Sequence, residues 1–119
     1  AGSFASEQNE NIFNTAYVFD RQGNNIASYQ KIHLFKLMEE HRYIAAGDRL
    51  CTFMLDGVKC GIIICYDLRF PELARKLALE GIQLLFVPAQ WPAARLEHWM
   101  TLLKARAIEN QIFIAAVNR

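Results

Sequence analysis

The chain has 119 residues, of which 53% are hydrophobic and 12% aromatic, which is enough to build a packed core. Its 13 basic and 12 acidic residues are interspersed and give a formal net charge of +1, which argues against the basic stripe of a nucleic-acid binder. No apolar run reaches the roughly 18 residues that cross a bilayer, and the N-terminus lacks a signal-peptide pattern. We therefore expect a globular cytoplasmic protein without nucleic-acid or membrane partners.

The N-terminal half of the chain predicts mainly strands. Residues 1–11 are small and polar and predict a loop, whereas 14–20 and 26–30 have strand character and flank turn residues, which predicts a hairpin. The charges in residues 31–43 fit neither a helix nor a strand, so a long ordered loop is expected there. Two further strands follow, at 50–55 and 58–65, joined by Asp56-Gly57, a pair typical of tight hairpin turns.

The C-terminal half alternates between helix and strand. It predicts a helix over 71–80 with Gly81 at its C-terminal cap, a strand over 82–87, a loop over 88–94, a helix over 95–110 and a strand over 112–117. This order implies parallel strand pairing in an α/β fold. The second helix places one apolar stripe at helical spacing: Leu96, Trp99, Met100, Leu103 and Ala107.

Cys65 stands where the buried run from Gly61 turns polar, just ahead of the helix that begins at Pro71. Strand ends of α/β sheets present reactive groups, so a nucleophilic thiol is one interpretation of this position. A small buried hydrophobe is the other, because most free cysteines are of that kind. The remaining cysteines, Cys51 and Cys60, form neither a CxxC pair nor a zinc spacing, and an odd number of thiols favours a reducing compartment.

A cysteine nucleophile needs a base or a cation nearby to form its thiolate. The chain offers three histidines, His33, His41 and His98, and nothing in their spacing selects one as a partner of Cys65. For His33 a packed or hydrogen-bonded structural role is favoured over a role as base. Patterns typical of metalloproteases, serine hydrolases and nucleotide-binding proteins are absent from the sequence.

Several motifs, taken together and in order, resemble the nitrilase (carbon-nitrogen hydrolase) superfamily. They are Lys31-Ile-His-Leu-Phe35, Cys65-Tyr-Asp-Leu-Arg-Phe-Pro-Glu-Leu73, Pro88-Ala-Gln-Trp-Pro92, His98-Trp99 and Ala105-Arg-Ala-Ile-Glu-Asn-Gln111. The resemblance runs over essentially the whole chain. It implies an α/β fold that is part of a four-layer α-β-β-α sandwich with a mixed sheet, and a single domain over residues 1–119 that is incomplete at both ends.

The resemblance also implies residue roles. Cys65 matches the nucleophile, Lys31 the catalytic lysine and Glu40 a second glutamate, whereas the family's general-base glutamate would lie upstream of Ala1. The thiolate would attack an amide carbonyl, with Lys31 and the backbone N–H of Tyr66 stabilising the oxyanion, and a thioester would form with release of ammonia. No cofactor or metal is implied, and the family suggests a homodimer or a larger homo-oligomer.

The residues around the nucleophile indicate the branch. Tyr66-Asp67 follows the cysteine, as in amidase-like branches, whereas true nitrilases usually carry Trp-Glu there. The motifs look closest to omega-amidase-like members, which act on terminal amides of dicarboxylic acids such as 2-oxoglutaramate.

A substrate carboxylate would need a cation in the pocket. Arg69 and Arg95 are candidates by charge alone, and the alternative for Arg69 is an ion pair with Asp67 or Glu72. Besides Tyr66 and Arg69, we expect two further residues to form the oxyanion or substrate-binding site: Gln90 and Trp91.

Two main functions and two weaker alternatives thus remain for comparison. The first is thiol-dependent hydrolysis of small omega-amides. The second is a noncatalytic fragment or pseudoenzyme that serves as a structural or interaction unit. Nitrile hydrolysis and a thiol protease that uses a Cys-His pair are weaker alternatives.

Overall fold

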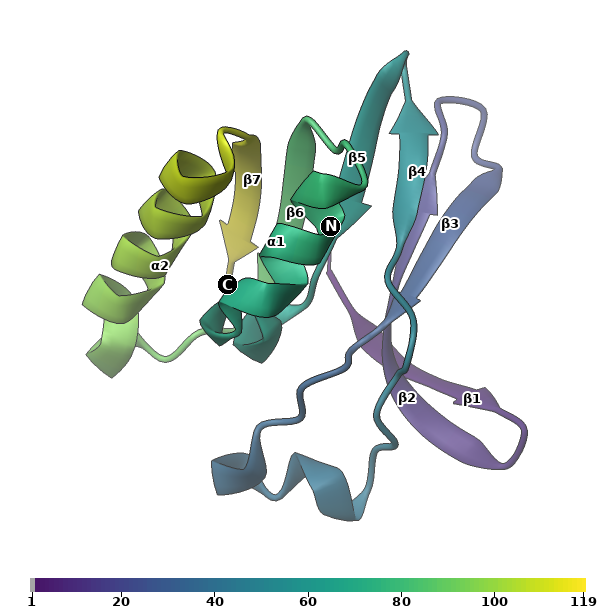
Figure 1. The fold of residues 1–119 in the computed structure, drawn as a ribbon. Coiled ribbons are helices and arrows are strands. Elements are labelled where there is room, and N and C mark those ends of the chain that lie inside the picture. The colour runs from purple at the N-terminus through teal and green to yellow at the C-terminus, as the bar shows by residue number, and fades with distance from the viewer. Residues whose placement is uncertain (1) are drawn as a thin grey trace.

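The computed structural model describes residues 2–119 and arranges them in three layers, one of helices and two of strands (Figure 1). The first sheet is antiparallel, in the order β1 (Phe4–Gln8), β2 (Asn11–Phe19) and β3 (Asn25–Gln30). The second has the order β4 (Thr52–Leu55), β5 (Val58–Ile62), β6 (Leu84–Ala89) and β7 (Phe113–Asn118). Helices α1 (Pro71–Leu79) and α2 (Leu96–Asn110) pack on this second sheet.

The second sheet is mixed. Strand β4 pairs antiparallel with β5, and β5, β6 and β7 pair in parallel. The parallel half coincides with the alternating helices and strands of the C-terminal half, because a parallel connection needs a crossover long enough to hold a helix. The α/β class and the parallel pairing predicted from this alternation are confirmed.

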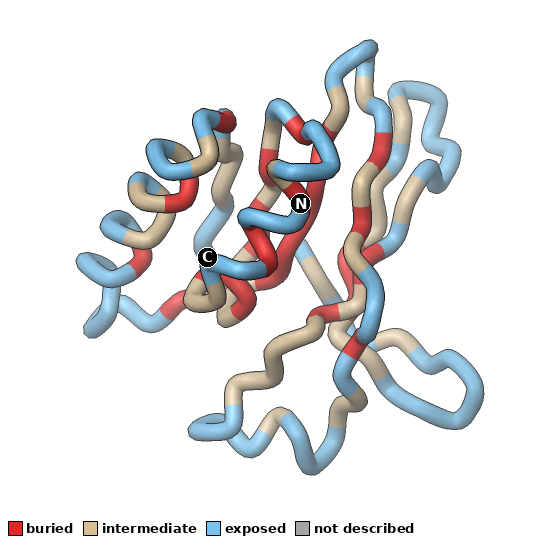
Figure 2. Tube along the Cα trace, viewed as in Figure 1, coloured by how far each residue is buried: buried red, intermediate tan, exposed pale blue. Residues whose placement is uncertain are grey.

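Two hydrophobic cores lie between the layers. The first joins the helices to the second sheet, and its buried side chains include Leu73, Leu77, Leu85, Val87 and Trp99. The second lies between the two sheets and includes Ala16, Tyr29, Phe53, Cys60, Ile62 and Ile64. Figure 2 shows the resulting band of buried residues along β5, β6 and the inner side of α1. Strand β5 contributes Cys60 and Ile62 to the second core, and Ile63, which directly follows the strand, belongs to the first.

The local signals of the sequence define several element ends correctly. Pro71 is the first residue of α1, where its missing N–H is not needed. Gly81 has a φ of 86°, the left-handed conformation that ends many helices. Asp56 and Gly57 both have positive φ, 49° and 81°, and connect β4 to β5 as a tight turn. Residues 31–43 form the expected loop, with two short 3-10 turns (Lys36–Met38 and Glu40–Arg42).

Several predicted boundaries are wrong. Residues 1–11 were expected to be a loop, but β1 and the start of β2 form a hairpin whose strands are mostly exposed and hence polar. The strand predicted over 58–65 ends at Ile62, because the backbone leaves the ladder before Cys65. Strand β6 continues through Pro88 and Ala89, which were assigned to a loop, since β7 pairs with both residues.

The predicted stripe of α2 is also partly wrong. Leu96 and Met100 are exposed at 49% and 47%, whereas Trp99 and Arg106 are buried. Arg106 is held inside because its guanidinium donates hydrogen bonds to the carbonyl groups of Leu68 and Arg69.

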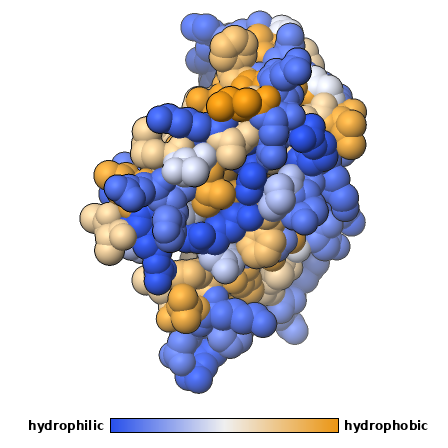
Figure 3. Space-filling model, turned by 60° about the vertical axis from the view of Figure 1, so that its left-hand side comes forward, coloured by the Kyte–Doolittle hydropathy of each residue, from blue (hydrophilic) through white to orange (hydrophobic). Residues whose placement is uncertain are grey.

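Figure 3 shows the side of the molecule nearer α2, where apolar patches alternate with hydrophilic ones. Within residues 2–119, no helix is long and apolar enough to cross a lipid bilayer.

Gly47 holds the end of the long loop against the segment that follows β3. Its N–H donates to the Lys31 carbonyl at 2.9 Å, and a Cβ on Gly47 would lie 2.3 Å from the Gln30 carbonyl oxygen. A Cβ on Gly61 would meet only side-chain atoms, the nearest at 3.1 Å. A methyl group at Gly47 would thus meet backbone, which cannot easily move, whereas one at Gly61 would meet side chains, which can.

We predict that Gly47→Ala destabilises the protein by about 3 kcal/mol, because backbone must shift to admit the methyl group. Gly61→Ala is the matched control and should cost less, since flexible side chains can adjust. Urea denaturation of both variants measures the difference in the free energy of unfolding. An equal loss of unfolding free energy in both variants would show that the contact with Gln30 does not exclude a methyl group at position 47.

Candidate active site

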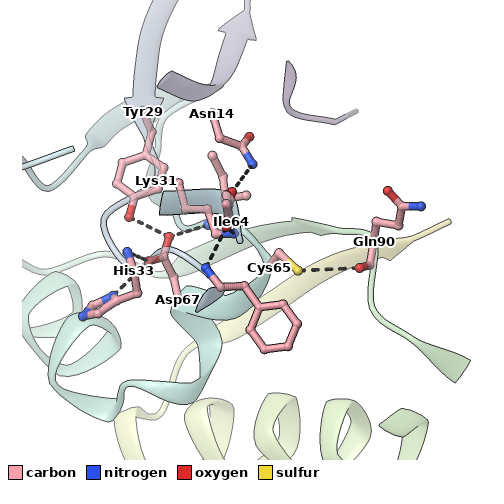
Figure 4. A network of polar contacts seen from close by, with 10 residues as sticks. Asn14, Tyr29, Lys31, His33, Ile64, Cys65, Asp67 and Gln90 are labelled. Carbon is pink, nitrogen blue, oxygen red and sulfur yellow. Dashed lines mark hydrogen bonds and ion pairs between the residues drawn. The ribbon is translucent and has the colours of Figure 1, made fainter. Parts of the chain in front are cut away.

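Cys65 lies at a sharp bend of the chain. Ile64 is extended, Cys65 adopts a φ of 48°, and residues Cys65–Arg69 then form a 3-10 helix. A left-handed conformation is unfavourable for a residue with a side chain, so the bend must be held by surrounding contacts. Its effect is to turn the thiol out of the sheet, where it contacts the Gln90 carbonyl at 3.8 Å (Figure 4).

Lys31 follows β3 directly and is 4% exposed. Its Nζ lies 2.6 Å from Oε2 of Glu40, which comes from the second 3-10 turn of the long loop. A buried ammonium is strongly disfavoured unless it is paired, so Glu40 is what allows Lys31 to remain charged. The pair therefore places one protonated amine beside the bend that carries Cys65.

Glu40 is held by two further donors. The backbone N–H of Phe35 donates to Oε2 at 2.7 Å, and Asn14 Nδ2 donates to Oε1 at 3.2 Å. Burial raises the pKa of Glu40, but the hydrogen bonds from Lys31, Phe35 and Asn14 together outweigh it, and the pKa lies below its usual value. Glu40 is thus an ionised carboxylate with a fixed orientation. Asn14 reaches the site from β2, and no sequence pattern marks it as a site residue.

The thiol of Cys65 is neutral at rest. Burial raises its pKa, and this effect exceeds the opposite effect of the Lys31 ammonium, which lowers the pKa. The charge of Glu40 raises it further. Because the thiolate is the nucleophile, the reaction of this cysteine requires a base.

The residues singled out in the sequence line one cavity of about 440 Å³. The set comprises Lys31, Glu40, Cys65, Tyr66, Arg69, Gln90 and Trp91, and Arg95 lies at the same cavity. Glu40 is the only acidic side chain in the lining, among the residues that the structure describes, and it is paired with Lys31. The cavity therefore combines a thiol, an ammonium and three guanidinium groups, those of Arg69, Arg95 and Arg119.

None of the three histidines lines this cavity, within residues 2–119. His33 Nδ1 lies 2.9 Å from the buried carboxylate of Asp67, and its ring stacks on Phe70 with centroids 3.6 Å apart. The structural role favoured for His33 is thus the one observed. The geometry gives no support to a Cys-His pair.

Arg69 does not pair with Asp67 or Glu72 among the described residues, so this alternative is wrong. Asp67 points inward and is fully buried, whereas the guanidinium of Arg69 lies 5.1 Å from the ring centroid of Trp91 and 3.3 Å from His98 Nδ1. No cluster of three or more metal-ligating side chains occurs in the described part of the chain.

The family model for carbon-nitrogen hydrolases matches residues 1–119. The chain belongs to the carbon-nitrogen hydrolase family. It is 52% identical to the 2-oxoglutaramate amidase of Bacillus subtilis (strain 168), over 99% of this chain and 46% of that protein. The chain thus spans about half the length of this curated relative.

Two solved structures have the same arrangement over half their length. One is a carbon-nitrogen hydrolase superfamily protein from Xanthomonas campestris with an arsenic adduct in its active site, at 38% identity and a TM-score of 0.92, covering 99% of this chain and 46% of that one. The other is a variant of the amidase from Nesterenkonia sp. AN1, in which acrylamide has added to the active-site cysteine. It has 34% identity and a TM-score of 0.90, covering 98% of this chain and 46% of that one.

We predict that Lys31→Met raises the pH midpoint of Cys65 alkylation by iodoacetamide, because the ammonium lowers the thiol pKa. A rise of about one pH unit corresponds to about 1.4 kcal/mol of lost charge interaction. Lys104→Met, on the exposed side of α2, is the control and should leave the midpoint unchanged. An unchanged midpoint in Lys31→Met would mean that the two groups do not interact.

Proposed function

We propose that this chain carries the nucleophile and the oxyanion-binding groups of an amidase that hydrolyses small omega-amides of carboxylic acids. The observation that carries the proposal is the convergence of Cys65, Lys31 and Glu40 on one cavity. A buried ammonium that is paired with a carboxylate and lies beside a thiol is suited to stabilise an oxyanion, and the family membership gives the reaction class.

In the proposed reaction, a carboxylate base takes the proton of Cys65 and the thiolate attacks the amide carbonyl. The Lys31 ammonium and the backbone N–H of Tyr66 stabilise the oxygen that becomes negative. The carbon–nitrogen bond then breaks, the base returns the proton to the leaving nitrogen, and ammonia departs from a thioester. Water activated by the same base hydrolyses the thioester to a carboxylic acid and restores the thiol.

In this scheme Glu40 positions Lys31. Its carboxylate already accepts three hydrogen bonds and its pKa is lowered, so it is a poor proton acceptor. Its carboxylate pairs with the Lys31 ammonium at 2.6 Å and so holds the proposed oxyanion donor in place. The base is therefore expected to be a separate carboxylate, in line with the upstream glutamate of the family.

The proposed substrate class rests on charge. Arg95 is exposed at the cavity with its guanidinium 6.0 Å from the ring centroid of Phe35, and among the described residues no carboxylate pairs with it. A guanidinium binds a carboxylate through two parallel hydrogen bonds, so Arg95 is suited to hold the far end of an omega-amide. The 52% sequence identity with a 2-oxoglutaramate amidase supports the same class of substrate, an amide that carries a carboxylate.

The proposal extends to the fold of the whole protein. We infer that residues 1–119 form part of a four-layer α-β-β-α sandwich, of which the described residues supply one helical layer and two sheets. Support comes from the first sheet, where the apolar side chains of Phe4 and Ile26 are exposed on the face opposite to Ala16 and Ala27. A second helical layer over this sheet would bury them.

We predict that the full-length protein releases ammonia from 2-oxoglutaramate and that Cys65→Ala abolishes the release, because no thioester can form. Ammonia is measured in a coupled assay at several enzyme concentrations. Release that persists in Cys65→Ala would contradict the mechanism, and no release by the wild-type protein would favour the noncatalytic alternative.

We also predict that Arg95→Gln lowers kcat/KM for succinamate by about 30-fold, which corresponds to the loss of a hydrogen-bonded charge pair of about 2 kcal/mol. Butyramide has the same length but no carboxylate, and its kcat/KM should stay within about twofold. Arg75→Gln, exposed on α1, is the matched control. Equal losses for both amides would show that Arg95 does not recognise the carboxylate.

A further inference from the structure

Asp67 is a fully buried carboxylate that accepts four hydrogen bonds. Its Oδ1 accepts from the backbone N–H of His33 at 2.8 Å and lies 2.9 Å from His33 Nδ1. Its Oδ2 accepts from the Tyr29 hydroxyl at 2.8 Å and from the backbone N–H of Ile64 at 3.0 Å. Figure 4 shows this carboxylate between the two segments of the site.

The partners of Asp67 flank the two proposed catalytic side chains. Tyr29 and His33 each lie two residues from Lys31, one on either side, and Ile64 immediately precedes Cys65. The carboxylate therefore binds the backbone or side chains on both sides of Lys31 and the backbone just before Cys65. No other side chain among the described residues makes hydrogen bonds to both segments.

The same carboxylate closes the bend at Cys65. Ile64 N–H donates to Asp67 Oδ2, and Asp67 N–H donates to the Ile64 carbonyl at 3.0 Å, so two reciprocal hydrogen bonds span the left-handed residue. A strained backbone persists only where its surroundings fix it. Asp67 supplies that fixation and links it to the Lys31 segment.

We propose that Asp67 is a positioning residue that sets the placement of Lys31 relative to Cys65, through Tyr29, His33 and the backbone of Ile64. Asp67 does not line the cavity and does not touch the substrate. The effect of Asp67 on kcat rests on the proposed amidase function. The placement of the Lys31 ammonium beside the Cys65 thiol does not, because it is a property of the resting protein.

The chemistry of the site requires a carboxylate at this position. All four partners are donors once His33 carries hydrogen on Nδ1, and an ionised carboxylate is an acceptor with two oxygens. An asparagine of the same size would present an N–H₂ group to one pair of partners and leave a backbone N–H, that of His33 or of Ile64, without its acceptor. Burial and the charge of Asp67 raise the pKa of Tyr29, so its hydroxyl remains a donor.

The test uses the full-length protein and two variants, Tyr29→Phe and Asp67→Asn. Tyr29→Phe removes a single hydroxyl and keeps the ring in the core between the sheets, so it is the variant expected to fold. Tyr17→Phe is the matched control, because among residues 2–119 the Tyr17 hydroxyl makes no hydrogen bond and its ring lies on the same sheet, stacked on Phe4. The readouts are kcat and KM for 2-oxoglutaramate, the pH midpoint of Cys65 alkylation by iodoacetamide, and the Tm.

If Asp67 positions the pair, Tyr29→Phe lowers kcat by about 10-fold with KM within about twofold, because displacements below 1 Å suffice for such losses. The alkylation midpoint rises, since Lys31 lowers the thiol pKa less well from a displaced position. Asp67→Asn shows the same changes more strongly, by about 100-fold in kcat. Tyr17→Phe matches the wild-type protein in all readouts.

The proposal is overturned if Tyr29→Phe lowers the Tm but leaves both kcat and the alkylation midpoint unchanged, because that is the result of a purely structural role. The alkylation readout needs no turnover. If the wild-type protein releases no ammonia, the amidase proposal fails, yet a raised midpoint in Tyr29→Phe still supports the positioning role and an unchanged midpoint still rejects it.

Discussion

The ion pair between Lys31 and Glu40 is the interaction on which the candidate site depends. An unpaired ammonium at 4% exposure would be strongly destabilised by the loss of its hydration, and the carboxylate of Glu40 offsets that cost. The pair in turn requires that Glu40 be held, which Asn14 and the N–H of Phe35 accomplish. The long loop between β3 and β4 is therefore ordered for an electrostatic reason, although it contains only two short 3-10 turns.

The layered fold delivers these groups from separate elements. Lys31 follows the end of β3, Cys65 comes three residues after β5, and Gln90 follows β6, so three strand ends in two sheets meet at one cavity. The core between the sheets fixes the spacing of the first two segments, since Tyr29 and Ile64 are both buried in it. Packing of the core thus sets the distance between the Lys31 and Cys65 segments, which a loop alone could not hold.

The sequence predicted those features that depend on neighbouring residues. Pro71, Gly81 and the Asp56-Gly57 turn mark element ends through their own backbone preferences, and the alternation of helix and strand implied parallel pairing. The site residues came from a family resemblance, since spacing alone selected no partner for Cys65. What local patterns could not show was the inward orientation of Asp67, because that depends on donors located 34 to 38 residues away.

The errors at α2 and at Asp67 have a common physical origin in buried polar groups. The stripe of α2 was assigned from apolar residues, but the buried face of the helix includes Arg106, whose guanidinium satisfies two carbonyl groups of the segment after Cys65. Asp67 was considered only as a partner of Arg69, and is instead enclosed by four donors. Hydropathy ranks such residues as exposed, whereas the three-dimensional arrangement of donors and acceptors decides their position.

The proposed reaction needs two carboxylates with different roles. One holds Lys31 and the other accepts the proton of Cys65. Glu40 is saturated with donors and its pKa is lowered, which keeps it ionised and suits it to hold Lys31. The thiol has a raised pKa, so its proton must go to a group with a higher proton affinity than Glu40. A carboxylate with fewer donors, desolvated by the bound substrate, meets that requirement. Two acids at one site can thus differ in function because one is fully hydrogen-bonded and the other is not.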